Sequence, residues 1–343
     1  MRARLIVAGV AALLVLGGTV AVASSVATDV QCTVTDNTLS CPLPVPAPVT
    51  VTATTTERVT VTPAPVTVTS TVTAAPSSTA TASSSPASSS SSSTPTTPPA
   101  SGEWPGVDST GVPAGVSLTA SGSITVTQAG TVIDGKDITG SVQVRAANVT
   151  IKNSRIKGSG TYCVQTFGSG SVVLEDVEIV GGCENAIGFD NWTARRVEIR
   201  GTYGDGVKLG SNVLLVDSWI HDLAPASGAH ADGGQVQGGV TNTVVRHNVI
   251  DLGSTPRANA ALFIAPDLGP STNGPLTIEQ NRLNGGNYIL FCVDGNNGQY
   301  HIKNITVRDN RFGNTFTYGR SRVNEPITQS GNVVDSTGAA LTL

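Results

Sequence analysis

A line of similar segments recurs through the second half of the chain, and this repeat constrains the fold more than any other feature. Each segment is a short alternating strand, a polar pair and one further apolar residue, as in residues 149–156. Repeats built on strands and spaced a few tens of residues apart are typical of a solenoid. The closing apolar residues lie 20 to 33 residues apart, at Ile156, Ile179, Ile199, Ile220, Ile250, Leu283 and Phe312.

A second column of strands lies between these segments, so each predicted coil holds three strands. One coil illustrates the pattern, with strands expected at 207–209, 214–216 and 219–220. Weaker coils at 123–126 and 131–138 and a last one near 331–334 bring the total to about nine or ten. The sequence therefore predicts an all-β parallel β-helix.

The bend between the second and third strands of each coil carries a polar residue. Asn and Asp tolerate the left-handed conformation that a sharp corner requires. Their side chains are also expected to form a hydrogen-bonded ladder between coils. The residues concerned are Asn153, Asp176, Asp217, Asn248, Asn281, Asn310 and Asn332.

The N-terminal third of the chain has the composition of an export signal followed by a spacer. Residues 1–23 combine Arg2 and Arg4 with an uninterrupted apolar run, which predicts a signal peptide, with an uncleaved membrane anchor as the alternative. Residues 24–101 are a low-complexity linker rich in Thr, Val, Ser and Pro, with too little apolar surface to form a core. Residues 102–343 form the predicted β-helix domain, secreted or attached to the cell surface.

Charge and cysteine content fit an extracellular protein. The net charge is −4, and only 13% of residues are charged. A mildly acidic chain argues against a nucleic-acid partner, contact with a membrane is expected only through the possible anchor, and we expect a monomer. Cys163 and Cys183 lie about one repeat apart and are placed to bridge neighbouring coils, Cys32 and Cys41 are placed to close a small hairpin, and Cys292 is expected to be buried and inert.

The repeat also serves as a ruler for the densest group of ionisable side chains. Strands in a parallel stack lie about 4.8 Å apart, so residues of one column become neighbours. Aligning the coils places Asp205 beside Asp232 and Lys208 beside Gln235. A long loop, 222–231, runs above them and carries His230. We interpret Asp205, Lys208, His230 and Asp232 as candidate catalytic residues.

These side chains suit cleavage of a polysaccharide in two ways. A lyase needs a base and a group that neutralises the developing charge, and Ca²⁺ held by Asp205 and Asp232 is one such group. A hydrolase needs two carboxylates flanking the glycosidic bond, one of them with a raised pKa. Candidate substrate-binding residues are His221, Asp222, Gln235, Gln237 and Phe263.

Each of these residues also has a purely structural interpretation. The two Asp-Gly pairs, at 205–206 and 232–233, are common turn chemistry, and Lys208 fits an ordinary solvated side chain. A non-catalytic surface protein that binds glycan, or acts as a stalked spacer, is therefore the principal alternative. A polymer-level uronate epimerase, which uses similar acid and base groups, is a third hypothesis.

The coils and polar bends over about residues 116–340 resemble the right-handed parallel β-helix of the pectate lyase and polygalacturonase superfamily. The runs at 204–206 and 230–233 carry Gly-Asp-Gly and His-Ala-Asp-Gly, without the full polygalacturonase motifs. The run at 219–222 reads Trp-Ile-His-Asp, whereas pectate lyases carry Trp-Ile-Asp-His. The resemblance implies the fold and a polysaccharide substrate, and it leaves the catalytic roles unassigned.

Overall fold

The structure is a computed structural model that describes residues 4–5, 30–31, 33–35, 38–40, 103–324 and 326–343. The chain divides into two units, residues 1–89 and 90–343. In the first unit, the described strands form two short antiparallel pairs, β1 (Arg4–Leu5) with β2 (Val30–Gln31) and β3 (Thr33–Thr35) with β4 (Thr38–Ser40). Most of the predicted signal, most of the linker, and Cys32 and Cys41 lie outside the described residues. None of the described helices is long and apolar enough to cross a membrane.

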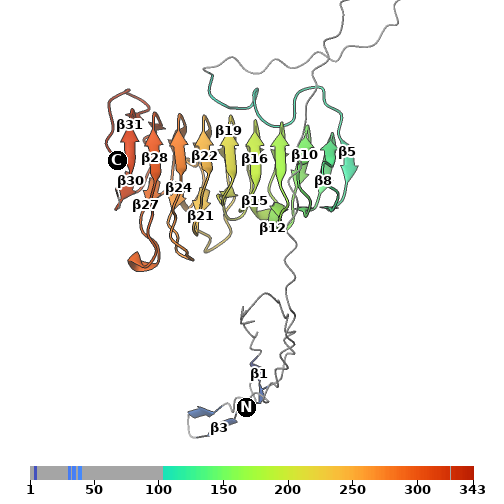
Figure 1. Ribbon diagram of the computed structural model, residues 1–343, viewed down its shortest axis with the longest axis horizontal. Helices are drawn as coiled ribbons and strands as arrows, with labels where there is room; N and C mark the ends of the chain where they lie inside the picture. The colour runs from blue at the N-terminus through green and yellow to red at the C-terminus, as the bar shows by residue number, and fades with distance from the viewer. Residues whose placement is uncertain (1–3, 6–29, 32, 36–37, 41–102, 325) are drawn as a thin grey trace, which may run out of the picture. The chain divides into compact units, whose positions relative to one another are not determined.

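The second unit is a stack of coils, and Figure 1 shows successive coils side by side. The strands of these coils form three parallel sheets. We name them sheets A, B and C in the order in which each coil visits them. Sheets A and B have nine strands each and sheet C has ten. The predicted three-strand coil and the predicted number of coils are therefore confirmed.

Sheet A contains β6 (Ile124–Val126), β9 (Val142–Val144), β12 (Gly160–Thr166), β15 (Cys183–Gly188), β18 (Val207–Lys208), β21 (Ala231–Val236), β24 (Ala258–Ile264), β27 (Tyr288–Cys292) and β30 (Gly319–Val323). Sheet B contains β7 (Val132–Asp134), β10 (Val149–Lys152), β13 (Val172–Glu175), β16 (Trp192–Arg195), β19 (Val213–Val216), β22 (Thr243–Arg246), β25 (Leu276–Glu279), β28 (Ile305–Arg308) and β31 (Thr328–Ser330). Sheet C contains β5 (Thr119–Ser121), β8 (Lys136–Thr139), β11 (Arg155–Lys157), β14 (Glu178–Ile179), β17 (Glu198–Ile199), β20 (Trp219–His221), β23 (Val249–Asp251), β26 (Arg282–Asn284), β29 (Arg311–Phe312) and β32 (Val333–Val334).

The core fills the interior of the coil because alternate residues of each strand point inward. In β10, Val149 and Ile151 are buried while Thr150 and Lys152 are partly exposed. The closing apolar residues of the sequence repeat, such as Ile220, form one continuous buried column in sheet C. The sequence periodicity thus corresponds directly to the inward face.

The corner between sheets B and C differs from the prediction by one residue in the later coils. Asn153, Asp176 and Asp217 adopt positive φ as expected. In the coils of Asn248 and Asn281, however, the left-handed residues are those immediately before the Asn, and the same shift applies at the next two corners. The residues with positive φ there are His247 (52°), Gln280 (55°), Asp309 (56°) and Gly331 (64°).

The four asparagines that follow these corners form the predicted ladder inside the coil. Asn281 Nδ2 donates to the Val245 carbonyl at 2.9 Å and to Asn310 Oδ1 at 3.0 Å. Its Oδ1 accepts from the backbone N–H of Asn248 at 3.0 Å. The same pattern continues from Asn310 to Asn332. Burial explains the shift, because only the residue after the corner points its amide into the interior.

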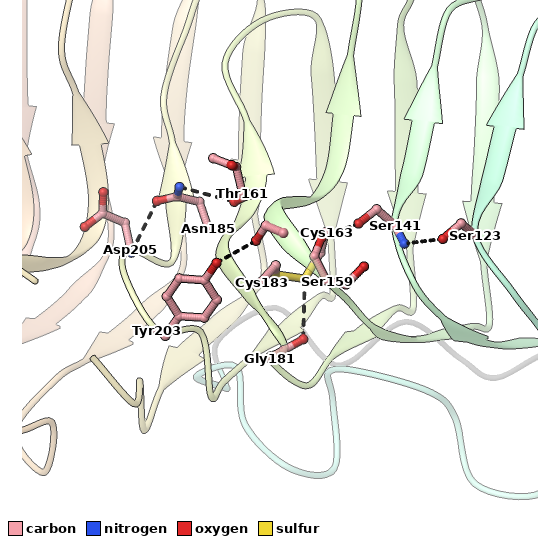
Figure 2. The surroundings of a disulfide bond; sticks show 11 residues. Ser123, Ser141, Ser159, Thr161, Cys163, Gly181, Cys183, Asn185, Tyr203 and Asp205 are labelled. Carbon is pink, nitrogen blue, oxygen red and sulfur yellow. Dashed lines mark hydrogen bonds between the residues drawn. A yellow bond between two sulfur atoms is a disulfide. The ribbon is translucent and has the colours of Figure 1, made fainter. Parts of the chain in front are cut away.

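The Cys163–Cys183 disulfide joins β12 to β15, confirming the predicted bridge between neighbouring coils. Figure 2 shows this bond, which runs from the middle of β12 to the first residue of β15. Cys292 is a free and buried thiol, as expected. Burial raises its pKa to about 12, so it stays protonated at neutral pH.

The longest connections lie elsewhere than the sequence indicated. The sequence predicted that the connections from sheet C to sheet A, such as 222–230, are the longest in each coil. The connections from sheet A to sheet B at 265–275 and 293–304 are longer, and the second contains the short 3₁₀ helix η1 (Asn296–Gly298). This corrects the expected rim of the groove, because those connections surround the outer face of β24 and β27.

We predict that Asn281→Ala destabilises the domain by about 3 kcal/mol, because it leaves a buried carbonyl and a buried N–H without partners. Urea unfolding followed by circular dichroism measures the change. Asn314→Ala, which removes an exposed amide, serves as the matched control and should change stability by less than about 0.5 kcal/mol. Equal effects of the two substitutions would contradict a structural role for the ladder.

Candidate functional site

Asp205, Lys208, Gln235 and Asp232 come together on sheet A as the register predicted. Lys208 pairs with Gln235 in the register of β18 and β21. Lys208 Nζ lies 2.5 Å from Asp205 Oδ2 and also donates to Gln235 Oε1. The backbone N–H of Asp232 donates to Asp205 Oδ1 at 2.8 Å. Both oxygens of the Asp205 carboxylate therefore have partners within the protein.

This cluster is buried. The exposed fraction is 4% for Asp205, 7% for Lys208 and 0% for Asp232. On the neighbouring coil, the Tyr162 ring lies against Gly188, where an added Cβ would come within 3.0 Å of the ring. The cluster thus has little surface from which to touch a polymer.

Asp205 and Asp232 belong to a longer row of polar side chains at the start of the sheet A strands. Asn185 accepts from the Asp205 backbone N–H at 3.3 Å and donates to the Thr161 carbonyl at 3.4 Å, and Figure 2 shows it between the two. The row extends from Asn185 through the two aspartates to Asn259 and Asn287. We call these five residues the sheet A polar row.

Asp232 is the one acid of this row with an incomplete set of partners. Asn259 Nδ2 donates to its Oδ1 at 3.0 Å, whereas its buried Oδ2 has no hydrogen-bond partner among the described residues. Burial, reinforced by the negative charge of Asp205, raises the pKa of Asp232 well above its usual value. The burial of Asp232 thus disfavours its charged form, while Asp205 is ion-paired with Lys208.

His230 lies apart from the acids, in an adjoining open pocket. It is exposed and shares a pocket of about 360 Å³ with Arg257, Asn259 and Asn287. Arg257 is fixed there by a 2.8 Å hydrogen bond from its guanidinium to the Pro225 carbonyl. Asn259 both lines this pocket and contacts Asp232, so it is the link between His230 and the buried acids. Alignment of the coils by sequence placed Ala260 in the column of Asp232, so Asn259 was not identified as its neighbour.

His221 and Asp222 lie on or just after sheet C and not with the Asp205 cluster. His221 Nδ1 is 2.7 Å from Asp222 Oδ2, its Nε2 is 3.2 Å from Glu198 Oε1, and its ring stacks on Trp219. Burial lowers the pKa of His221, but hydrogen bonds to Glu198 and Asp222 raise it more, so the net shift is upward. Arg200 completes this ionic network through Glu198. The Glu-Ile pairs at 178–179 and 198–199, which recur one coil apart, are the sequence feature from which this ionic network could have been predicted.

Phe263 lies in β24 of sheet A and is partly exposed. Its ring is parallel to that of Phe291, with centroids 4.7 Å apart, and Arg322 lies over the Phe291 ring at 5.3 Å. Both rings line a pocket of about 470 Å³, whose other residues include Asp267 and Asp294. We call the Phe263, Phe291 and Arg322 stack with this pocket the aromatic pocket. Phe291 was missed although it follows Phe263 in the same outward column.

Gln237 follows β21, half-buried, and its carbonyl accepts from the Leu268 N–H at 2.9 Å. This contact ties the end of β21 to the connection 265–275 beside the aromatic pocket. Gln235 pairs with Phe263 in the register of β21 and β24. Both glutamines therefore lie between the buried cluster and the aromatic pocket.

The two aspartates do not form a favourable cation site. Among the described residues, no group of three or more His, Cys, Asp or Glu side chains is arranged to hold a metal ion. Asp205 is already ion-paired with Lys208, and Asp232 is fully buried with a raised pKa. The residues present therefore do not fit the Ca²⁺ ligand set considered from the sequence.

The comparisons with known proteins identify the fold. The family model described as a right-handed β-helix region matches residues 112–265. Together with the three parallel sheets, this match defines the second unit as a right-handed parallel β-helix. The searches of curated proteins and of solved structures found no significant match.

We predict that Asp232→Asn stabilises the domain at neutral pH and removes a pH dependence. An unfolded Asp loses its proton near pH 3.9, whereas folded Asp232 keeps it to a much higher pH. Stability from this group is fully present below pH 3.9 and is lost as pH rises through the folded pKa. Melting temperatures of both proteins from pH 4 to 9 should diverge with rising pH, and parallel curves would contradict a neutral Asp232.

Proposed function

We propose that the protein is an exported, extracellular β-helix that binds a polysaccharide along the outer face of sheet A, as a monomer. The observation that carries the proposal is the aromatic pocket. Parallel Phe263 and Phe291 rings, with Arg322 beside them, are bordered by the carboxylates and amides of the connections 265–275 and 293–304. Apolar ring edges combined with a few polar groups are suited to a sugar, which has both apolar and hydroxyl surfaces.

Binding without turnover is favoured over cleavage because of where the acid and base groups lie. A general acid or base must come within about 3 Å of the proton that it transfers. Asp205, Lys208 and Asp232 are buried and bonded to one another. Their arrangement supports a structural role, which fixes the register of β18 and β21 beneath the binding face.

Cleavage by a lyase or hydrolase is the second candidate, and one observation favours it. Asp232 has a raised pKa, as a proton donor requires, and its neighbour Asn259 lines the pocket of His230. Asp232 is fully buried, so the acid would have to become exposed before it could contact a sugar. An epimerase would use the same residues and would likewise require Asp232 to become exposed.

We predict that Phe263→Ala weakens polysaccharide binding about tenfold, which corresponds to about 1.4 kcal/mol, because it removes one of the two stacked rings. Glycan arrays identify the ligand, and affinity electrophoresis quantifies binding. Phe167→Ala is the matched control, since this half-buried ring lies under Arg145 at the far end of sheet A. Its affinity should equal that of the wild type.

The same polysaccharides, incubated with wild type and Asp232→Asn, test the second candidate. Reducing-end assays and absorbance of unsaturated uronates should show no product with either protein. Product formation that depends on Asp232 would replace the binding proposal by a catalytic one. Absence of binding to every glycan on the array would also overturn it.

A further inference from the structure

A second cavity lies over the outer face of sheet C, away from the aromatic pocket of sheet A, and it takes no part in the function proposed above. Its volume is about 580 Å³. Its floor is the outer side of β23, β26 and β29, where Asp251 and Asn284 share one column and Arg282 and Arg311 share the next. Trp104 and Asp335 complete the wall.

The polar groups of this cavity are held in place by one another. Arg282 Nε is 2.8 Å from Asp335 Oδ2, and Arg311 Nε is 2.7 Å from Asp335 Oδ1. Asn284 Nδ2 donates to Asp251 Oδ1 at 2.9 Å. Side chains fixed in this way lose little conformational entropy when a ligand binds.

The formal charge of the lining is zero, because Arg282 and Arg311 balance Asp251 and Asp335. Burial raises the pKa of Asp335, but the two arginines lower it by more, so the net shift is downward and this acid carries its negative charge between them. The cavity therefore offers many hydrogen-bonding groups without a net attraction for an anion or a cation.

Trp104 supplies the apolar part of the wall. It belongs to the extended segment before the first coil, and its ring stacks on His247 with centroids 5.5 Å apart. The indole is half-buried and borders the cavity. An indole beside paired carboxylates, amides and guanidinium groups matches a pyranose ring, which has an apolar C–H face and a rim of hydroxyl groups.

We propose that this cavity is a binding site for a neutral sugar, with Trp104 stacking on the ring and Asp251, Asn284 and Arg282 contacting its hydroxyl groups. The site lies on sheet C, whereas the aromatic pocket lies on sheet A. The two sites share no lining residue. The proposal therefore stands or falls independently of the function assigned to sheet A.

The test uses the β-helix protein with xylo-, manno-, cello- and malto-tetraose as neutral probes and tetragalacturonate as the anionic probe. Tryptophan fluorescence and calorimetry should detect saturable binding of at least one neutral probe. Trp104→Ala and Arg282→Ala should each weaken that binding at least tenfold. Arg308→Ala, which removes an exposed arginine of sheet B paired with Glu279, should leave it unchanged.

Binding of no neutral probe, or equal binding by wild type and Trp104→Ala, would overturn the proposal. Stronger binding of tetragalacturonate than of any neutral probe would overturn the assignment of a neutral ligand. If Trp104→Ala fails to fold, Arg282→Ala decides alone, because Arg311 still holds Asp335 in that variant. Loss of neutral-sugar binding in Phe263→Ala, and not in Trp104→Ala, would assign the binding to sheet A.

Discussion

The hydrogen bonds between successive coils are the constraint on which the rest of this structure depends. They keep each residue of a strand beside its counterpart one coil away. The neighbours of an outward or inward side chain are therefore the side chains at the same position of the adjacent coils. The asparagine ladder, the sheet A polar row and the Phe263–Phe291 stack are three results of this one rule. Columns of asparagines satisfy one another, whereas two acids in one column raise the pKa of the more deeply buried acid, Asp232.

The sheet A polar row shows this last effect most clearly. Asp205 is ion-paired with Lys208, which lies three residues later on the same coil. Among the described residues, no cationic side chain forms an ion pair with Asp232, which is more deeply buried. A buried ion pair is weak evidence for stability in itself, but removing one partner leaves an uncompensated charge. The three residues are therefore coupled, and their chemistry is best understood as that of a unit.

The sequence was sufficient to predict what the repeat controls directly. The three-strand coil and the pairing of Lys208 with Gln235 follow from counting along columns. The spacing of Cys163 and Cys183 by about one repeat allowed a bridge without requiring one, since Gly160 is the residue in register with Cys183. The exact corner residue did not follow, because Asn suits both the left-handed corner and the buried position after it. Asn248 shows that burial, which the repeat alone does not specify, decides between the two.

The candidate site was harder to predict for the same reason. Adjacency of Asp205 and Asp232 was correct, but their burial, at 4% and 0% exposure, is not specified by the repeat. His221 was grouped with them because it is close in sequence, although a coil places successive strands on different faces. The aromatic pocket depends on connections of irregular length, for which the repeat provides no template.

The disulfide has a mechanical consequence for a domain built in this way. A coil stack pulled by its N-terminal end would lose its coils one after another, since each is held mainly by hydrogen bonds to the next. Cys163 and Cys183 tie β12 to β15 covalently. Peeling from that end would meet a covalent barrier there, and the coils carrying the aromatic pocket and the floor of the sheet C cavity lie beyond it.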